Sequence, residues 1–149
     1  MTKSVVAVAI AALAMGTGLA ACSDDDGPDV TAKMTEFTVT PDPDRVGAGS
    51  ITIKADNVGG ETHELVLVKA DSASDLPTDK DGAVDEEAFA SAGVEAMGEV
   101  EDVEKGTSKD LTADLDAGNY VVFCNIVEDE DGEIVSHYAE GMVASLTVE

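Results

Sequence analysis

The chain has 149 residues, which is enough for one domain and too few for two substantial cores. It carries 32 Asp and Glu residues against 8 Lys and Arg residues, which gives a formal net charge of -24 at pH 7. This charge excludes nucleic acid as a partner, because the phosphate backbone would be repelled. Acidic residues are spread along most of the chain, which indicates a solubilising surface. A docking face for a basic partner protein is the alternative.

The N-terminal segment has the layout of a secretory signal. Met1-Thr2-Lys3 forms a short basic end, residues 4–21 are uncharged and mostly apolar, and Cys22 follows two alanines. The sequence Leu-Ala-Ala-Cys resembles the lipobox of bacterial lipoproteins. This resemblance implies that residues 1–21 are a cleaved signal peptide and that Cys22 receives lipid, which would anchor the chain on the periplasmic or cell-surface side of the membrane. A retained transmembrane helix and a secreted protein cut at the same site are the alternatives.

The second cysteine of the chain needs an explanation in such a compartment. Residues 22–31 are polar and acidic and predict a flexible tether, so that residues 32–149 form the folded domain. If Cys22 is lipidated, Cys124 remains as a single thiol outside the cytoplasm, where thiols usually form disulfides. Metal ligation would explain this thiol. A disulfide between Cys22 and Cys124 and an inert buried cysteine are the alternatives.

Alternation of apolar and polar residues predicts strands along most of the folded domain. The expected strands are residues 34–40, 50–55, 63–68, 107–115, 120–124 and 143–148. Residues 86–97 are rich in Ala at roughly helical spacing and predict a short helical insertion. This pattern favours an all-β fold, an antiparallel Greek-key β-sandwich with a core of mostly Val, Ile, Leu and Ala. The motif Asp116-x-Gly118-x-Tyr120 suggests a tyrosine corner, with an ordinary turn as the alternative.

Four side chains with soft donor atoms fall beside the ends of predicted strands. They are His63 and His137, which are the two histidines of the chain, together with Cys124 and Met142. Four residues separate His137 from Met142, and Gly141 lies between them, so one tight loop can present both side chains. Alone, each residue has an ordinary interpretation as a core or surface residue. Together, two imidazoles, a thiolate and a thioether suit copper better than a hard cation.

These motifs resemble those of the cupredoxin (blue copper, plastocyanin-like) family over roughly residues 32–149. The resemblance rests on the segments 57–65, 120–126 and 137–142. It implies that one copper ion per chain is bound equatorially by His63, Cys124 and His137 and axially by Met142. It also implies one-electron transfer at a type 1 (blue) site, a redox partner protein and no enzymatic activity.

One segment departs from the family pattern, since twelve residues separate Cys124 from His137 instead of a few. Residues 127–135 are acidic with a turn at Asp131-Gly132, and they predict either a projecting hairpin or a loop that loosens the site. Glu128 or Asp129 as an additional ligand is disfavoured, because carboxylates prefer harder ions. Zinc is the competing metal. The competing functions are an extracytoplasmic copper carrier that delivers its ion to an acceptor, and a metal-free β-sandwich interaction module.

Overall fold

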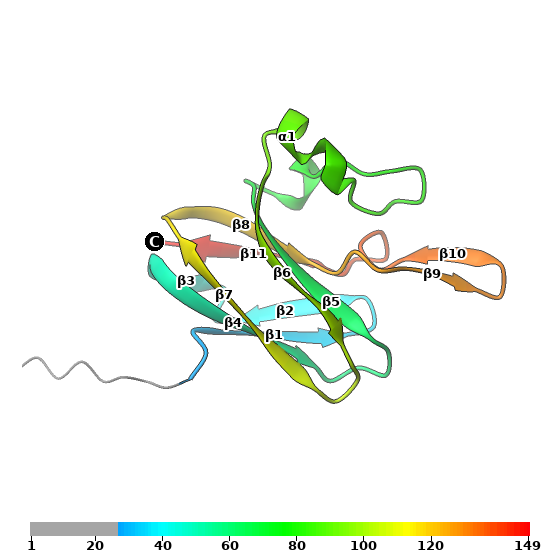
Figure 1. The fold of residues 1–149 in the computed structure, drawn as a ribbon, viewed down its shortest axis with the longest axis horizontal. Helices are drawn as coiled ribbons and strands as arrows, with labels where there is room; N and C mark the ends of the chain where they lie inside the picture. Colours follow the sequence, from blue (N-terminus) through cyan, green and yellow to red (C-terminus); the bar gives the residue numbers. More distant parts are fainter. Residues whose placement is uncertain (1–26) are drawn as a thin grey trace, which may run out of the picture.

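Two β-sheets face each other in the computed structural model, which describes residues 27–149 (Figure 1). One sheet has the strand order β2-β1-β4-β7, the other has the order β3-β11-β8-β5-β6, and β9 and β10 form a separate hairpin. The strands are β1 Val30–Thr35, β2 Thr38–Asp42, β3 Arg45–Val46, β4 Gly49–Asn57, β5 His63–Lys69, β6 Glu95–Val103, β7 Ser108–Leu115, β8 Gly118–Phe123, β9 Val127–Glu130, β10 Glu133–Ser136 and β11 Val143–Val148. The predicted signal peptide, residues 1–21, and the predicted lipidation site, Cys22, lie outside the described residues.

The core lies between the two sheets and is built by alternation along the strands. In β4, for example, every second residue from Ile51 to Asn57 is buried. Most of the buried side chains are Val, Ile, Leu and Ala, as the sequence predicts, with Met34, Met142 and Tyr120 among the larger ones. The Tyr120 hydroxyl donates a hydrogen bond of 2.8 Å to the backbone oxygen of Asp116. This bond confirms the contact expected of a tyrosine corner.

The strand pairing is mixed, which differs in part from the antiparallel expectation. Strand β1 pairs with β4 in parallel, and β11 pairs with β3 in parallel, whereas β8 pairs in antiparallel fashion with both β5 and β11. Neither parallel pair joins consecutive strands: β2 and β3 lie between β1 and β4 in the sequence, and most of the chain lies between β3 and β11. The all-β sandwich with a helical insertion is confirmed, and its Greek-key path stays a prediction.

Two predicted elements differ from the structure. The single strand expected over residues 34–40 is a hairpin, because the chain turns between β1 and β2 at Phe37, whose φ is 60°. The helix expected over residues 86–97 ends early at Gly93, whose φ is 75°, and the chain then enters β6. The sequence pattern therefore does not indicate strand β6. Strand β1 also begins at Val30, inside the segment predicted as a tether.

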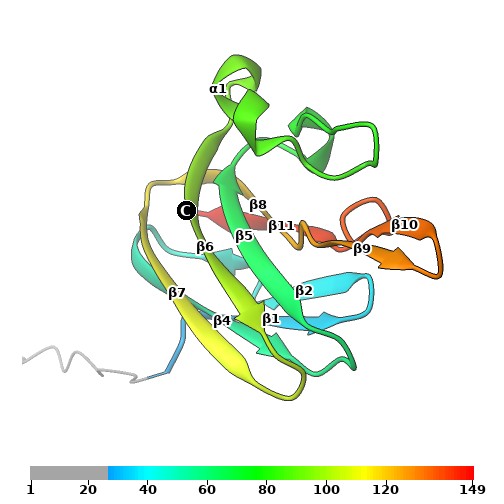
Figure 2. The same ribbon diagram turned by 45° about the vertical axis from the view of Figure 1, so that its right-hand side comes forward.

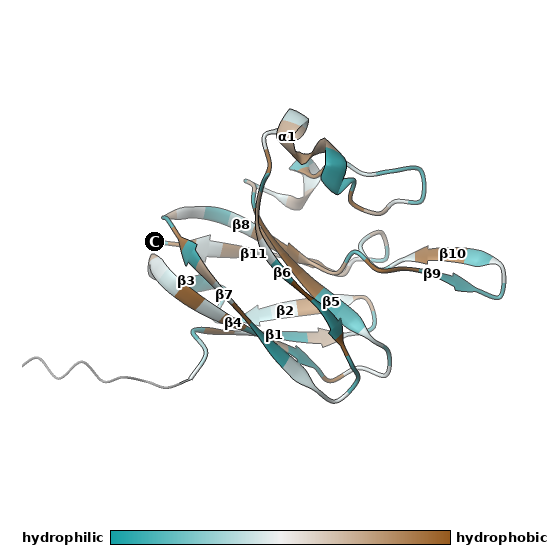
Figure 3. Ribbon diagram, viewed as in Figure 1, coloured by the Kyte–Doolittle hydropathy of each residue, from teal (hydrophilic) through white to brown (hydrophobic). Residues whose placement is uncertain are grey.

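The helical insertion covers the outer face of the five-stranded sheet (Figure 2). It contains two 3-10 helices, Ala73–Asp75 and Glu86–Ala88, and the short helix α1, Phe89–Ala92. The insertion contributes Leu76, Val84, Phe89 and Val94 to a second apolar cluster, and the strands contribute Val66, Val68, Val121 and Phe123. This double coverage explains why β5 is apolar along most of its length, while β9 in the hairpin is mostly hydrophilic (Figure 3). Within residues 27–149 no helix has the length and apolarity needed to cross a membrane.

Candidate metal centre

The strand topology brings the four candidate ligands to one end of the sandwich. His63 is the first residue of β5, and Cys124 directly follows β8. Because these strands are antiparallel, with Val66 opposite Phe123, the start of β5 lies beside the end of β8. Met142 directly precedes β11, which is antiparallel to β8, and therefore also lies at this end.

Backbone hydrogen bonds fix the loop that carries His137 and Met142. The backbone N–H of Met142 donates to the oxygen of His137 at 2.9 Å, and the N–H of Cys124 donates to the oxygen of Met142 at 3.1 Å. Gly141 adopts a φ of 113°, which a residue with a side chain rarely adopts. The loop therefore closes on itself and places both residues next to Cys124, as the four-residue spacing predicts.

Three of the candidate ligands converge on one point. The Nδ1 atom of His137 lies 3.3 Å from the Nδ1 atom of His63 and 3.4 Å from the Sγ atom of Cys124. The donor atoms of all three residues lie within 4.8 Å of one another. The Met142 side chain is fully buried and belongs to the same core cluster as Cys124. The convergence expected of these residues is observed, while their role as ligands stays a prediction.

This geometry fits a single metal ion. Nitrogen and sulfur ligands lie about 2.0–2.3 Å from an ion such as zinc, so two ligands of one ion are less than about 4.6 Å apart. Both separations measured from the Nδ1 atom of His137 satisfy this limit. The donors are also shielded from water, since Cys124 and His63 are 0% exposed and His137 is 1% exposed. The three residues are therefore placed to hold a metal ion in a dry, closed site.

Burial favours the uncharged forms of Cys124 and His63. Burial raises the pKa of the Cys124 thiol to about 11, although the backbone N–H of Glu64, 3.5 Å from the sulfur, opposes this shift. Burial and the neighbouring His137 lower the pKa of His63. A buried thiolate is costly without a positive partner. A bound cation would supply that partner and would draw the proton off the thiol.

The loop before His63 is held by residues that the sequence reasoning missed. The Asn57 side chain donates to the backbone oxygens of Glu61 and Val103, both at 2.7 Å. The Glu36 carboxylate accepts hydrogen bonds from the backbone N–H groups of Gly60 at 2.6 Å and Glu61 at 3.0 Å. Asn57 belongs to the segment 57–65 on which the resemblance rests, so its side chain could have been anticipated. Glu36 could not, because it reaches the loop from the β1–β2 turn.

Two further contacts border the site. The Phe37 ring packs edge-on against the His137 ring, with centroids 5.4 Å apart and an interplanar angle of 83°. The Glu64 carboxylate accepts a hydrogen bond of 2.9 Å from the backbone N–H of Asn125, which ties the start of β5 to the residue after Cys124. Burial raises the pKa of Glu64. Phe37 and Glu64 thus help to fix the positions of the ligand-bearing segments.

The solved structures to which this chain is similar include two bacterial proteins. The dithionite-reduced auracyanin from the photosynthetic bacterium Roseiflexus castenholzii matches with a TM-score of 0.51 and 18% sequence identity, over 83% of this chain and 99% of that one. The azurin Az-iso2 from the obligate methylotroph Methylomonas sp. strain J matches with a TM-score of 0.50 and 15% identity, over 80% of this chain and 95% of that one. These two likenesses show that the chain has the cupredoxin fold that the sequence predicted. No protein-family model and no curated protein matches the sequence.

Proposed function

We propose that the chain is a mononuclear copper protein that transfers one electron at a time at a type 1 (blue) site. The observation that carries this proposal is the buried convergence of His63, Cys124 and His137. Two imidazoles and one thiolate, with a thioether as a weak fourth ligand, are the donor set of blue-copper sites. The proposed ligands are the Nδ1 atoms of the two histidines, the Sγ atom of Cys124 and the thioether of Met142. One copper ion, when bound, would supply a Cu(I)/Cu(II) couple.

The protein part of the mechanism is to hold these donors still and to exclude water. His63, Cys124 and Met142 lie on or beside strands of the five-stranded sheet, His137 follows the β9–β10 hairpin, and backbone hydrogen bonds link Cys124, His137 and Met142. A rigid frame keeps the same donor positions in both oxidation states, so little reorganisation accompanies electron transfer. Burial of all four side chains leaves no accessible position for a substrate, which supports electron transfer over an enzymatic role.

Electron transfer and copper delivery use the same ligands and need a kinetic experiment to separate them. The copper-loaded chain is examined by voltammetry, and its Cu(I) form is mixed with a strong Cu(I) chelator. An electron carrier gives a reversible one-electron wave and releases copper to the chelator slowly, because its ligands are buried. Irreversible voltammetry together with rapid release of Cu(I) would contradict electron transfer and favour delivery.

We further propose that the protein works outside the cytoplasm, tethered to the membrane by lipid on Cys22. The support is the signal-like leader with its lipobox-like end, together with a buried, unpaired Cys124 in the described part of the chain. A redox partner or a copper acceptor would then be met at the membrane surface. Mass spectrometry of the mature N-terminus tests the anchor, since a lipidated cysteine is expected there. An N-terminus that begins elsewhere would contradict it.

A further inference from the structure

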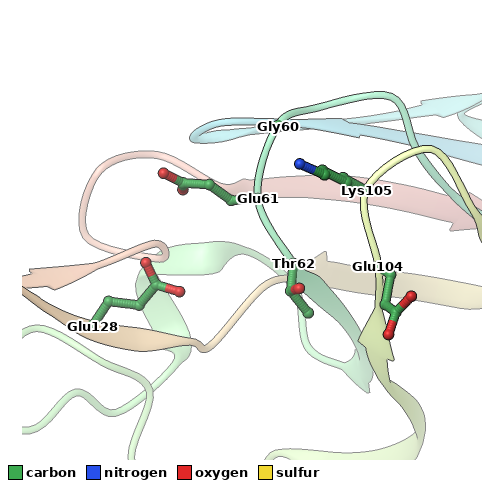
Figure 4. A pocket seen from close by; sticks show the side chains of 6 residues that line it. All are labelled: Gly60, Glu61, Thr62, Glu104, Lys105 and Glu128. Atoms are coloured by element: carbon green, nitrogen blue, oxygen red, sulfur yellow. The ribbon is translucent and has the colours of Figure 1, made fainter.

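The outer edge of the His137 ring faces a second group of potential metal ligands. The Nε2 atom of His137 lies 3.9 Å from Oε2 of Glu128, and one carboxylate oxygen of Glu61 lies within 4.8 Å of both residues' donor atoms. Glu61 precedes His63 in the β4–β5 loop, and Glu128 is in β9. Figure 4 shows both carboxylates on the same side of a surface pocket, opposite Lys105 and Glu104.

Two of these atoms lack a hydrogen-bond partner although they are buried. They are the Nε2 atom of His137 and the Oε2 atom of Glu61, and the His137 side chain is only 1% exposed. The 3.9 Å separation between His137 and Glu128 is too long for a hydrogen bond. It is compatible with two ligands of one ion, because ligands at about 2.0–2.2 Å from an ion can be separated by up to about 4.4 Å. A cation would satisfy both buried atoms at once.

We propose that Glu61, Glu128 and the Nε2 atom of His137 form an outer site for a divalent transition-metal ion. One imidazole with two carboxylates is a mixed nitrogen and oxygen donor set, which suits Cu(II) or Zn(II) better than a purely oxygen-seeking cation. The adjoining pocket has a volume of about 410 Å³ and gives an ion access from solvent, with room for water ligands. Lys105, which also lines the pocket, is the one cationic side chain among the lining residues.

The outer site shares His137 with the proposed inner copper site, and this sharing makes the two sites exclusive. A neutral imidazole has a free lone pair on only one of its nitrogens. Binding at the inner site uses Nδ1 and leaves a proton on Nε2, whereas binding at the outer site uses Nε2 and leaves a proton on Nδ1. The outer site is thus occupied while the inner site is empty, and it releases its ion as the inner site fills. This role as a staging site rests on the proposed function, but the outer site itself does not.

The test uses Zn²⁺ as the probe and a full-length Cys124→Ser chain, which lacks the inner thiolate. Calorimetry measures the Zn²⁺ affinity, and ¹⁵N chemical shifts of labelled histidine identify the nitrogen that binds. The expected result is a shift of Nε2 of His137, with Glu61→Gln and Glu128→Gln each lowering the affinity at least about tenfold. Glu104→Gln is the matched control, since it removes the same charge from the same pocket and should change affinity less than about twofold. Cys124→Ala replaces Cys124→Ser if the serine variant does not fold.

Several outcomes would overturn the outer site. They are the absence of Zn²⁺ binding, a shift at Nδ1 of His137 instead of Nε2, and an equal loss of affinity in Glu104→Gln, which would indicate attraction by acidic charge alone. In the wild-type chain, prior loading with copper should abolish binding of Zn²⁺ at Nε2. Because the Cys124→Ser chain cannot give a thiolate-to-copper band, a failure of the outer site and a failure of the blue-copper proposal are separate results.

Discussion

The buried sulfur of Cys124 is the proposed thiolate ligand of the site. This sulfur lies 3.4 Å from the Nδ1 atom of His137, receives the backbone N–H of Glu64 at 3.5 Å and has no exposed surface. Burial raises the pKa of the thiol to about 11, so the sulfur is protonated at neutral pH unless a cation binds it. Metal binding must therefore displace a proton from Cys124. The same raised pKa affects the stability of the metal-free chain.

We expect the metal-free chain to lose stability in alkaline solution through Cys124. The folded-state pKa is raised from 9.0 to about 11, so the unfolded thiol ionises first and the folded state retains more protons between these values. The contribution of this thiol is complete below pH 9 and is lost as pH rises toward 11, with a size of up to about 3 kcal/mol. Urea unfolding at a series of pH values measures it. In Cys124→Ser this part of the decline should be missing, and an unchanged decline would contradict the assignment.

Met142 should affect the potential of the site more than its assembly. Leu has a similar volume, so Met142→Leu should cost less than about 1.5 kcal/mol of stability and leave the three other ligands in place. Loss of the thioether removes a donor that stabilises the oxidised ion, so the reduction potential should rise. Voltammetry of the copper-loaded chain measures the shift. The control is Met97→Leu, because Met97 is a half-buried methionine of β6 that is not a proposed ligand. This substitution should leave the potential unchanged. An unshifted potential in Met142→Leu would exclude the thioether as a ligand.

The convergence of His63, Cys124 and His137 could be predicted from sequence because histidine and cysteine are scarce in the chain. The chain has two histidines and two cysteines, and one of the cysteines, Cys22, is the predicted lipidation site, so few combinations exist. The carboxylates near the site could not be selected in this way. Glu36, Glu61 and Glu128 are three of 32 acidic residues, and only the folded structure shows which of them face a histidine. The sequence disfavours Glu128 as an additional inner ligand, and in the structure its carboxylate faces the outer nitrogen of His137.

At the scale of elements, the β9–β10 hairpin accounts for the twelve residues that separate Cys124 from His137 in the sequence. The inserted residues pair with one another, Glu130 with Glu133 and Val127 with Ser136, and project away from the sandwich (Figure 1). The backbone N–H of His137 donates to the oxygen of Ile126 at 2.9 Å, which closes the base of the hairpin. The alternative of a loop that loosens the site is therefore disfavoured.

The hairpin should be dispensable for the inner site. Replacing residues 129–134 by Asn-Gly keeps Glu128 and Val135 opposite each other and provides a two-residue turn. Because the closing bond at Ile126 and His137 lies outside the deleted residues, copper binding and the visible spectrum should be unchanged. A folded variant that no longer binds copper would show that the tip of the hairpin helps to build the site.

The helical insertion should contribute stability without contacting the site. Phe89 is 7% exposed and packs with Val66 and Phe123 on the outer face of the five-stranded sheet. Phe89→Ala should lower the free energy of unfolding by about 3 kcal/mol, because it leaves a cavity. Thermal or urea unfolding measures the loss, and the copper spectrum should stay the same. Val58→Ala, at a residue that is 51% exposed, should change stability by less than about 0.5 kcal/mol. Equal effects of both substitutions would contradict this packing.

The elements that sequence failed to predict share a cause. In residues 34–40 the alternation of apolar and polar residues is interrupted only at Thr35-Glu36, so the reversal at Phe37 leaves a weak mark on the pattern. In β6, Ala96 and Gly98 weaken the strand signal, and the strand is stabilised by pairing with β5. Tertiary pairing determines both elements, whereas strands β4, β5 and β11 carry enough local alternation to be predicted.

At the scale of the whole molecule, a cupredoxin fold holds a soft-donor site inside a strongly acidic chain. The net charge is -24, and the hairpin beside the site adds an acidic rim that includes Glu128, Asp129 and Glu130. A partner that approaches this end should therefore present basic residues, and its association should weaken as salt is added. Fold and charge are consistent with electron transfer. The proposed electron transfer itself depends on whether the buried donors bind copper through Cys124.

Visible absorption during a Cu(II) titration of the full-length chain tests this dependence most directly. We expect an intense thiolate-to-copper band that saturates at one ion per chain, with a matching copper signal in EPR, and we expect the Cys124→Ser chain to lack the band. A folded wild-type chain that stays colourless with excess Cu(II), or a band that persists in Cys124→Ser, would contradict this expectation.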